Sequence, residues 1–331
     1  MTAPLLSVGD VVVDFRTRAG AARVLDHVSL DVAAGEVLGI VGESGCGKSM
    51  TALSIMGLVP NPPGKVTSGS IRLEGRELVG LSERELCDIR GRDIGMIFQE
   101  PMSSLNPVLT VGEQIAESVR LHEGAGKRAA MARAVEMLRA VEIPEAEMRA
   151  RAYPHQLSGG MRQRVMIAIA LACRPRVLIA DEPTTALDAT VQAQIFDLLQ
   201  DLQRDTGTAI ILITHDMGAI AELADRVAVM YAGRVVEKGA VRTVLSHPEH
   251  PYTQGLITCV PHLEPDPPPE RAPLPEIPGV VPALTALGRG CAFAPRCPAR
   301  IDRCTAEKPP LEETEGGHLA ACWVAREGAP A

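Results

Sequence analysis

The segment of residues 42–49 constrains the fold of this chain more than any other stretch. It runs Gly-Glu-Ser-Gly-Cys-Gly-Lys-Ser and matches the phosphate-loop pattern G-x-x-x-x-G-K-[ST]. In such a loop the backbone N–H groups surround phosphates, Lys48 reaches the β and γ oxygens, and Ser49 coordinates Mg²⁺. The sequence therefore predicts a nucleoside triphosphate site, formed by Gly42, Glu43, Ser44, Gly45, Cys46, Gly47, Lys48, Ser49 and Met50.

The flanking sequence favours this interpretation over that of an ordinary flexible turn. Residues 36–41 are an apolar run of strand length, and residues 48–56 have the pattern of a helix that stops at Gly57. A strand, a loop and a helix in this order place the phosphates at a helix N-terminus, where the partial positive charge favours anions.

Two further apolar runs end in polar side chains. Residues 177–180 precede Asp181 and Glu182, and residues 209–214 precede His215. Continuous apolar runs are typical of central parallel strands, and ligands bind at the carboxyl ends of such strands. We expect Asp181 to help hold Mg²⁺, usually through water, Glu182 to polarise the attacking water, and His215 to contact the γ-phosphate. Solvated surface carboxylates and a structural histidine are the alternatives.

Residues 157–160, Leu-Ser-Gly-Gly, complete a set of motifs that resembles the ATP-binding cassette (ABC) ATPases. Ser158 is a good N-cap for the following helix, and Gly159 and Gly160 leave its amide groups open to an anion. The resemblance implies that these three residues complete the ATP site of a facing subunit, so that two cassettes enclose two ATP molecules. An ordinary capped helix start is the structural alternative.

Other positions fit the ABC pattern residue by residue. Gln99 resembles the glutamine that senses Mg²⁺ and the attacking water, and His215 resembles the switch histidine. Residues 186–188 resemble the loop through which the two cassettes communicate, which places Asp188 at the ATP of the facing subunit. Phe15 is the candidate for stacking on adenine, with a core aromatic as its alternative. The catalytic residues implied by the resemblance are Glu182, His215 and Gln99.

A narrower resemblance links residues 99–107, 158–164 and 250–253 to the ATPase subunits of bacterial dipeptide, oligopeptide and nickel importers. It implies uptake of peptides or a related small solute through two membrane permeases, with a second, paralogous ATPase and an external binding protein. It also implies an α/β fold, namely a P-loop (RecA-like) ABC ATPase domain over residues 1–258 with a helical subdomain at about residues 100–158.

Charge and hydropathy agree with these expectations. The chain has 33 Lys and Arg against 41 Asp and Glu, and this net charge of −8 disfavours a nucleic-acid surface. No apolar run is long enough to span a bilayer, and the first residues lack the pattern of a signal peptide. We expect a peripheral protein at the cytoplasmic face of the cell membrane. The alternative is a soluble ABC ATPase acting on DNA or ribosomes, but such relatives usually carry two cassettes or a long coiled-coil insertion.

Prolines and cysteines characterise the last part of the chain. The prolines between residues 261 and 282 exclude a helix or central strand, which predicts a linker over residues 259–289. Beyond it we predict a small domain over residues 290–331 that holds four of the eight cysteines, Cys291, Cys297, Cys304 and Cys322.

The spacing of these four cysteines bears on what they bind. Their gaps of five, six and seventeen residues differ from the C-x₂-C pairs typical of zinc. Stable disulfides are not expected in a reducing cytoplasm, which leaves zinc, an iron–sulfur cluster or free thiols. The importer subunits that this chain resembles carry a similar cysteine motif, which implies a 4Fe–4S cluster with a structural or regulatory role. A fifth cysteine, Cys46, lies in the phosphate loop at a helix N-terminus, which is expected to lower its pKa.

Overall fold

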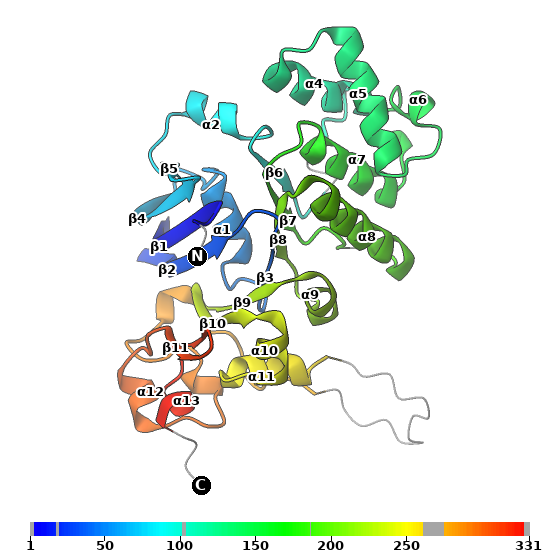
Figure 1. The fold of residues 1–331 in the computed structure, drawn as a ribbon. Coiled ribbons are helices and arrows are strands. Elements are labelled where there is room, and N and C mark those ends of the chain that lie inside the picture. Colours follow the sequence, from blue (N-terminus) through cyan, green and yellow to red (C-terminus); the bar gives the residue numbers. More distant parts are fainter. Residues whose placement is uncertain (1–2, 18–19, 101–103, 186, 261–274, 328–331) are drawn as a thin grey trace, which may run out of the picture.

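The computed structural model describes residues 3–17, 20–100, 104–185, 187–260 and 275–327. Its strands form two sheets, and helices cover and extend the larger one (Figure 1). The larger sheet has the order β11-β12-β10-β9-β3-β8-β7-β6. Its strands are β3 (Val37–Val41), β6 (Ile94–Ile97), β7 (Val177–Asp181), β8 (Ala209–Ile213), β9 (Arg226–Tyr231), β10 (Arg234–Ala240), β11 (Glu312–Glu315) and β12 (His318–Ala320).

The five strands β9, β3, β8, β7 and β6 run parallel. Alternate side chains of β3 enter two apolar cores, Val37 and Val41 on one face and Leu38 and Ile40 on the other. Burial on both faces explains why these strands are mainly apolar. Parallel pairing also brings the carboxyl ends of these strands to one edge of the sheet.

The smaller sheet is antiparallel and has the order β2-β1-β4-β5. It consists of β1 (Leu6–Thr17), β2 (Gly20–Val32), β4 (Gly64–Leu73) and β5 (Arg76–Glu77). Its apolar face and helix α1 (Lys48–Ile55) enclose one core with the larger sheet, in which Leu25, Ile40 and Ile55 are fully or almost fully buried. This core supports the residues that precede and follow the phosphate loop.

A group of helices projects from the larger sheet at the upper right of Figure 1. It contains α4 (Val111–Glu123), α5 (Lys127–Ala140), α6 (Ala146–Arg149), the 3₁₀ turn η1 (Pro154–Gln156) and α7 (Gly159–Leu171). Thr110 and Glu113 form a capping box that begins α4, and Leu138 of α5 is fully buried. The fold thus contains a helical subdomain, as expected, and its predicted bounds of about residues 100 and 158 remain a prediction.

Further helices flank the sheets. They are α2 (Glu83–Ile89), α8 (Ala189–Thr206), α9 (Met217–Leu223), α10 (Val241–Ser246) and α11 (Pro251–Thr258). Helix α8 ends where Gly207 adopts a left-handed conformation with φ of 67°. None of the helices in the described ranges is both long and apolar enough to cross a membrane.

Residues 275–327 pack against the part of the chain that contains the phosphate loop. They contain the 3₁₀ turns η2 (Leu284–Ala286) and η3 (Ala294–Arg296), the helices α12 (Asp302–Ala306) and α13 (Trp323–Glu327), and the hairpin β11–β12. Strand β12 pairs with β10 and so extends the larger sheet. The predicted division at residues 258 and 290 remains a prediction, and residues 261–274 of the predicted linker lie outside the described residues.

Candidate functional site

The phosphate loop joins β3 to α1 and has the strand, loop and helix order that the motif requires. Two of its glycines are fixed by close contacts. A Cβ atom on Gly42, at φ of 149°, would lie 2.2 Å from the carbonyl oxygen of Met230, and one on Gly47, at φ of 108°, would lie 2.8 Å from Leu25. Only glycine allows the loop to lie this close to β2 and β9.

The Lys48 side chain is buried inside the loop. Its ammonium group donates hydrogen bonds to the carbonyl oxygens of Gly42 (2.7 Å) and Glu43 (3.2 Å). Beside the loop lies a cavity of about 280 Å³ that brings together several residues predicted from the sequence. It is lined by Val24, Ser44, Gly45, Gly47, Lys48, Ser49, Met50, Gln99 and Glu182.

Neighbouring strands place polar side chains at the same edge. Glu182 follows β7, His215 follows β8, and Gln99 follows β6. The Gln99 amide donates to Glu182 Oε2 at 2.9 Å, and Nδ1 of His215 lies 3.7 Å from Glu182 Oε1. The sequence-predicted trio therefore meets at one carboxylate. Glu182 itself has a φ of 48°, a left-handed backbone conformation that residues other than glycine rarely adopt.

Asp181 faces the phosphate loop from the end of β7. Its Oδ1 accepts a hydrogen bond from the Ser49 hydroxyl at 3.1 Å. Burial raises the pKa of Asp181, the Glu182 carboxylate acts in the same direction, and the Ser49 hydrogen bond partly opposes both. The two oxygen groups are of the type that Mg²⁺ prefers, so the predicted donor set fits this ion.

The residues expected to complete the ATP site of a facing subunit lie at a different place. Ser158 caps α7 by accepting a hydrogen bond from the N–H of Met161 at 3.3 Å, and Asp188 caps α8 by accepting from Val191 at 3.1 Å. Gly159 and Gly160 form the first turn of α7, which solvent reaches. The four residues do not line the cavity beside the phosphate loop. Ala186, the first residue of the predicted communication loop, lies outside the described residues.

The surroundings of Phe15 and Cys46 bear on two further predictions. Phe15 is partly buried and packs against Gly64, where an added Cβ atom would lie 2.6 Å from the phenyl ring, and it does not line the cavity. Its stacking on adenine stays a prediction. Cys46 is fully buried, and burial raises its pKa. The expectation of a lowered pKa was wrong because desolvation of the thiolate outweighs the attraction of Lys48 and the backbone hydrogen bonds to the sulfur.

Several contacts of this site were not predicted from the sequence. The Thr185 hydroxyl donates to Glu182 at 3.0 Å, and the Tyr252 hydroxyl accepts a hydrogen bond from the Glu43 N–H at 2.8 Å. The Arg296 guanidinium forms an ion pair with the Glu43 carboxylate. Tyr252 belongs to the stretch 250–253 that carries the importer resemblance, which was the available signal. Arg296 is adjacent to Cys297, but no motif marks it.

The four C-terminal cysteines gather in one region. The Cys291 N–H donates to the Cys304 carbonyl at 2.8 Å, and both side chains pack around Ala294 and the indole of Trp323. Burial raises the pKa of Cys291 to about 11, with contributions from the nearby Cys304 and Cys322 thiols. Four thiols are the donor type of an iron–sulfur cluster. Within the part of the chain that the structure describes, however, no group of three or more His, Cys, Asp or Glu side chains is arranged to hold a metal ion.

Two family models match the chain. The model of the ABC transporter family covers residues 25–185, and that of the oligopeptide/dipeptide transporter C-terminal region covers residues 236–304. Among solved structures, the dimeric post-hydrolysis state of an ATP-binding cassette with bound ADP and Pi is similar, with a TM-score of 0.65 and 31% identity. This match covers 72% of this chain and 99% of that chain. The fold and the phosphate loop thus define an ABC ATPase, and the chain belongs to the ABC transporter family.

Relatives of nearly the same length narrow this class. A probable peptide ABC transporter ATP-binding protein of Sinorhizobium fredii is 51% identical over 323 residues, which covers 98% of this chain and 96% of that protein. The oligopeptide transport ATP-binding protein OppD of Salmonella typhimurium is 51% identical over 319 residues, which covers 96% of this chain and 93% of that protein. Within the ABC family, the chain is therefore similar in extent and sequence to ATP-binding proteins of peptide transporters.

Proposed function

We propose that this chain is the ATP-hydrolysing subunit that drives uptake of peptides through an ABC importer at the cytoplasmic face of the cell membrane. The observation that carries the proposal is the identity of about half of all residues with peptide-transport ATP-binding proteins over almost the whole chain. The match of residues 236–304 to the oligopeptide/dipeptide transporter C-terminal region supports it, because this segment is additional to the ATPase motifs.

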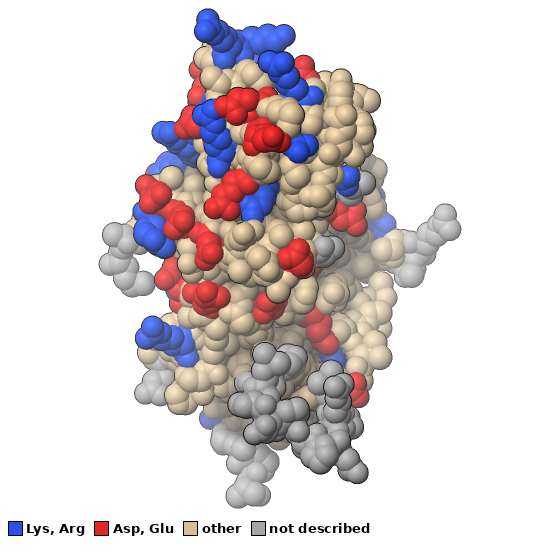
Figure 2. Space-filling view, turned by 90° about the vertical axis from the view of Figure 1, so that its right-hand side faces the viewer, with Lys and Arg blue, Asp and Glu red and all other residues tan. Residues whose placement is uncertain are grey.

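The proposed assembly contains two membrane permeases, a second and paralogous ATPase subunit, and an external binding protein that delivers the peptide. On the face shown in Figure 2, acidic and basic side chains are interspersed. This mixture, together with the net charge of −8, differs from the basic stripe expected of a nucleic-acid surface. A soluble role on DNA or ribosomes is the less favoured alternative.

In the proposed reaction, water attacks the γ-phosphorus of ATP in line with the departing ADP. Glu182 accepts a proton from this water, and Gln99 and His215, which contact Glu182 in the structure, orient the water and the γ-phosphate. Lys48 turns from the loop carbonyls to the phosphates, and Phe15 stacks on the adenine. Ser49, and Asp181 through water, would hold Mg²⁺, which supplies neutralisation of phosphate charge when bound.

The facing subunit supplies the remaining contacts. Ser158, Gly159 and Gly160 begin α7 at a turn that solvent reaches, which suits its N–H groups to bind the γ-phosphate of the partner's ATP. Asp188 lies at the first turn of α8 and completes the same interface. Such a site forms only when two cassettes approach each other, so ATP favours their closure.

We also propose that Cys291, Cys297, Cys304 and Cys322 bind a 4Fe–4S cluster. The packing of Cys291 and Cys304 in one small core supports this, and thiols are soft donors that suit iron–sulfur chemistry better than a hard ion. The test is the iron and acid-labile sulfide content of anaerobically purified protein, with the Cys304→Ser variant as the matched control. Finding one equivalent of zinc and no sulfide would show that the four cysteines form a zinc site and not an iron–sulfur cluster.

The transport function is tested by affinity purification of the tagged subunit from detergent-solubilised membranes, followed by mass spectrometry. Two permeases and a second ATPase are expected in the wild type. A strain that carries the Lys48→Ala variant should retain this assembly but fail to accumulate labelled peptide. Recovery from the soluble fraction with ribosomal proteins or DNA would instead support the alternative.

A further inference from the structure

We propose that Arg296 and Tyr252 are positioning residues for ATP binding, because they hold the phosphate loop from the C-terminal side through Glu43. This goes beyond the transport function and depends only on the ATPase activity. It gives residues 275–327, called the C-terminal region from here on, a direct physical connection to the nucleotide site.

Several side chains hold Glu43. The Arg296 guanidinium binds its carboxylate in a bidentate manner, with Nη1 at 2.7 Å from Oε2 and Nη2 at 3.0 Å from Oε1. The Tyr252 hydroxyl accepts its backbone N–H at 2.8 Å, and the Lys48 ammonium donates to its carbonyl oxygen at 3.2 Å. The side chain and both backbone polar groups of this loop residue are therefore fixed.

Arg296 is itself held rigidly. Its side chain is 4% exposed, and it also donates to the carbonyl oxygens of Ile277 and Pro278 and to the Tyr231 hydroxyl. A guanidinium with so many fixed partners has little freedom to follow a moving carboxylate. The geometry of the ion pair is thus imposed on the loop by the C-terminal region.

An aromatic cluster supports both positioning residues. Tyr231, Tyr252 and Phe293 are fully or almost fully buried, with ring centroids 4.7 to 5.4 Å apart in each pair. The chain contains only four Phe, three Tyr and one Trp, so a large share of its aromatic side chains lies in this cluster. Packed rings resist displacement and make the support of the loop stiff.

The charge of Arg296 also matters for ATP. Glu43 places a carboxylate in a loop that must bind a triphosphate, and an unpaired negative charge there would repel the phosphates. Arg296 pairs with this charge and holds it on the side of the loop that faces Tyr252 of α11. Because Arg296 lies between Cys291 and Cys297, a change that reshapes the cysteine region will also alter this support.

The test compares ATP affinity and turnover in the wild type and in variants of this pair. We expect Arg296→Gln to weaken ATP binding about tenfold in isothermal titration calorimetry and to raise KM more than it lowers kcat. Arg296→Lys should restore part of the affinity, because it keeps the charge but loses the bidentate geometry. Glu43→Gln combined with Arg296→Gln should weaken binding by less than the product of the two single effects, since the two residues act as a pair.

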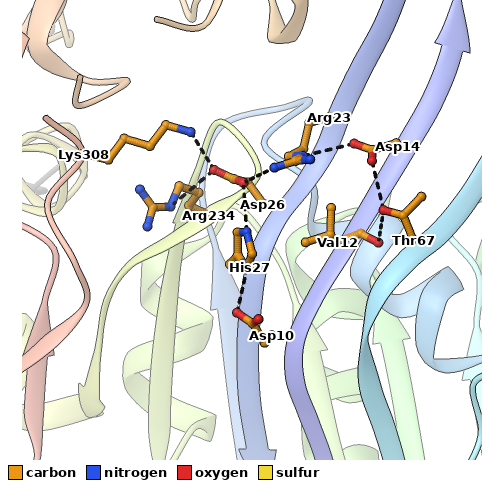
Figure 3. A network of polar contacts seen from close by, with 9 residues as sticks. All are labelled: Asp10, Val12, Asp14, Arg23, Asp26, His27, Thr67, Arg234 and Lys308. Atoms are coloured by element: carbon orange, nitrogen blue, oxygen red, sulfur yellow. Dashed lines mark hydrogen bonds and ion pairs between the residues drawn. The ribbon is translucent and has the colours of Figure 1, made fainter. Parts of the chain in front are cut away.

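The Lys308–Asp26 ion pair provides a matched control (Figure 3). It also joins the C-terminal region to the nucleotide-binding part, with a distance of 2.8 Å, but it does not touch the phosphate loop. Lys308→Ala should therefore lower stability without changing ATP affinity.

Two results would overturn the proposal. One is an Arg296→Gln variant that folds normally and binds ATP like the wild type, and the other is a loss of affinity in Lys308→Ala equal to that in Arg296→Gln. Both readouts use the isolated subunit, so they leave the peptide-uptake experiment independent. Failure of the transport function would leave the ATP-binding result unaffected.

Discussion

At the scale of single residues, three neighbouring side chains hold Glu182. Gln99, Thr185 and His215 contact its carboxylate, and its backbone has a left-handed conformation. These constraints aim the carboxylate at the space beside the phosphate loop. Such preorganisation is expected of a general base, because its geometry must be set before the water is deprotonated.

Glu182→Gln tests this role. We expect the variant to bind ATP like the wild type but to lose turnover by at least about 100-fold, because the amide cannot accept the proton. Phosphate release measures turnover, and calorimetry measures ATP affinity. Glu222→Gln, on the exposed surface of α9, is the control and should keep full activity. Retained turnover in Glu182→Gln would assign the proton transfer to another group.

Asp181 gives a prediction about pH. Burial raises its pKa above the value of 3.8 taken for the unfolded chain, so the folded state binds the proton more tightly. Stability therefore falls as the pH rises through the interval between the two pKa values, and it stays lower above that interval. Asp181→Asn removes the buried charge and should raise the melting temperature of the nucleotide-free protein at neutral pH.

The same variant should bind ATP more weakly in the presence of Mg²⁺, because a negatively charged oxygen near the ion is lost. Its thermal advantage should shrink as the pH is lowered toward the unfolded pKa. Thermal unfolding at several pH values, with and without Mg²⁺ and ATP, measures both effects. An advantage that grows toward acidic pH would contradict a raised pKa at Asp181.

The sequence predicted the polar residues at this edge because each follows a local pattern. Glycines, a lysine and an apolar run followed by acids are all visible within ten or so residues. Arg296 could not be predicted in this way, since it pairs with Glu43 across 253 positions and belongs to no motif. The pKa of Cys46 was predicted in the wrong direction because sequence shows the helix N-terminus but not the extent of burial.

At the scale of elements, a glycine in β6, Gly95, allows β6 and α7 to lie close together. A Cβ atom on Gly95 would lie 2.5 Å from the backbone oxygen of Ala170 and 3.0 Å from Pro175. Helix α7 begins with Gly159 and Gly160, which are proposed to bind the partner's ATP, and Gln163 in the same helix donates to the Pro183 carbonyl beside Glu182. The position of α7 is therefore linked to both halves of the proposed ATP site.

Gly95→Ala should displace α7 from the sheet, because the closest atom is backbone and cannot move independently. We expect a loss of about 1–3 kcal/mol in the free energy of unfolding and reduced ATP turnover. Denaturant unfolding is the measurement. Gly288→Ala is the matched control, since an added Cβ there has no neighbour within 4 Å. Equal stability of the two variants would show that the close approach is relaxed without cost.

Element positions were predictable where periodicity or an apolar run was strong. Strands β3, β7 and β8 and helices α1 and α7 lie where the sequence placed them, apart from shifts at their ends. The hairpin β11–β12 was not predicted. Its strands are short, and their place beside β10 depends on packing contacts that no local pattern encodes.

At the scale of the whole molecule, one apolar core joins the helical subdomain, the parallel strands and the C-terminal region. It includes Leu138, Leu178 and Phe293. Phe293 lies at its C-terminal end, where its ring meets that of Tyr231 at a centroid distance of 5.3 Å. The C-terminal region is therefore expected to unfold together with the nucleotide-binding part.

Phe293→Ala should lower the stability of the entire chain by about 3–5 kcal/mol, because a large ring is removed from a closed core. Scanning calorimetry should show one transition that shifts as a whole to lower temperature. The control is Val280→Ala, at a position that is 88% exposed, which should leave the transition in place. Two separate transitions, only one of them shifted, would indicate an independent C-terminal domain.

Trp323 has a practical consequence for observing this molecule. It is the single tryptophan of the chain, and it lies beside Cys304, with the guanidinium of Arg303 3.5 Å from the centre of its ring. Intrinsic fluorescence excited at the tryptophan band therefore originates from one known point, remote in sequence from the phosphate loop. The protein thus contains its own optical reporter, and a change in emission on adding ATP would register at the cysteine region an event that begins at Lys48.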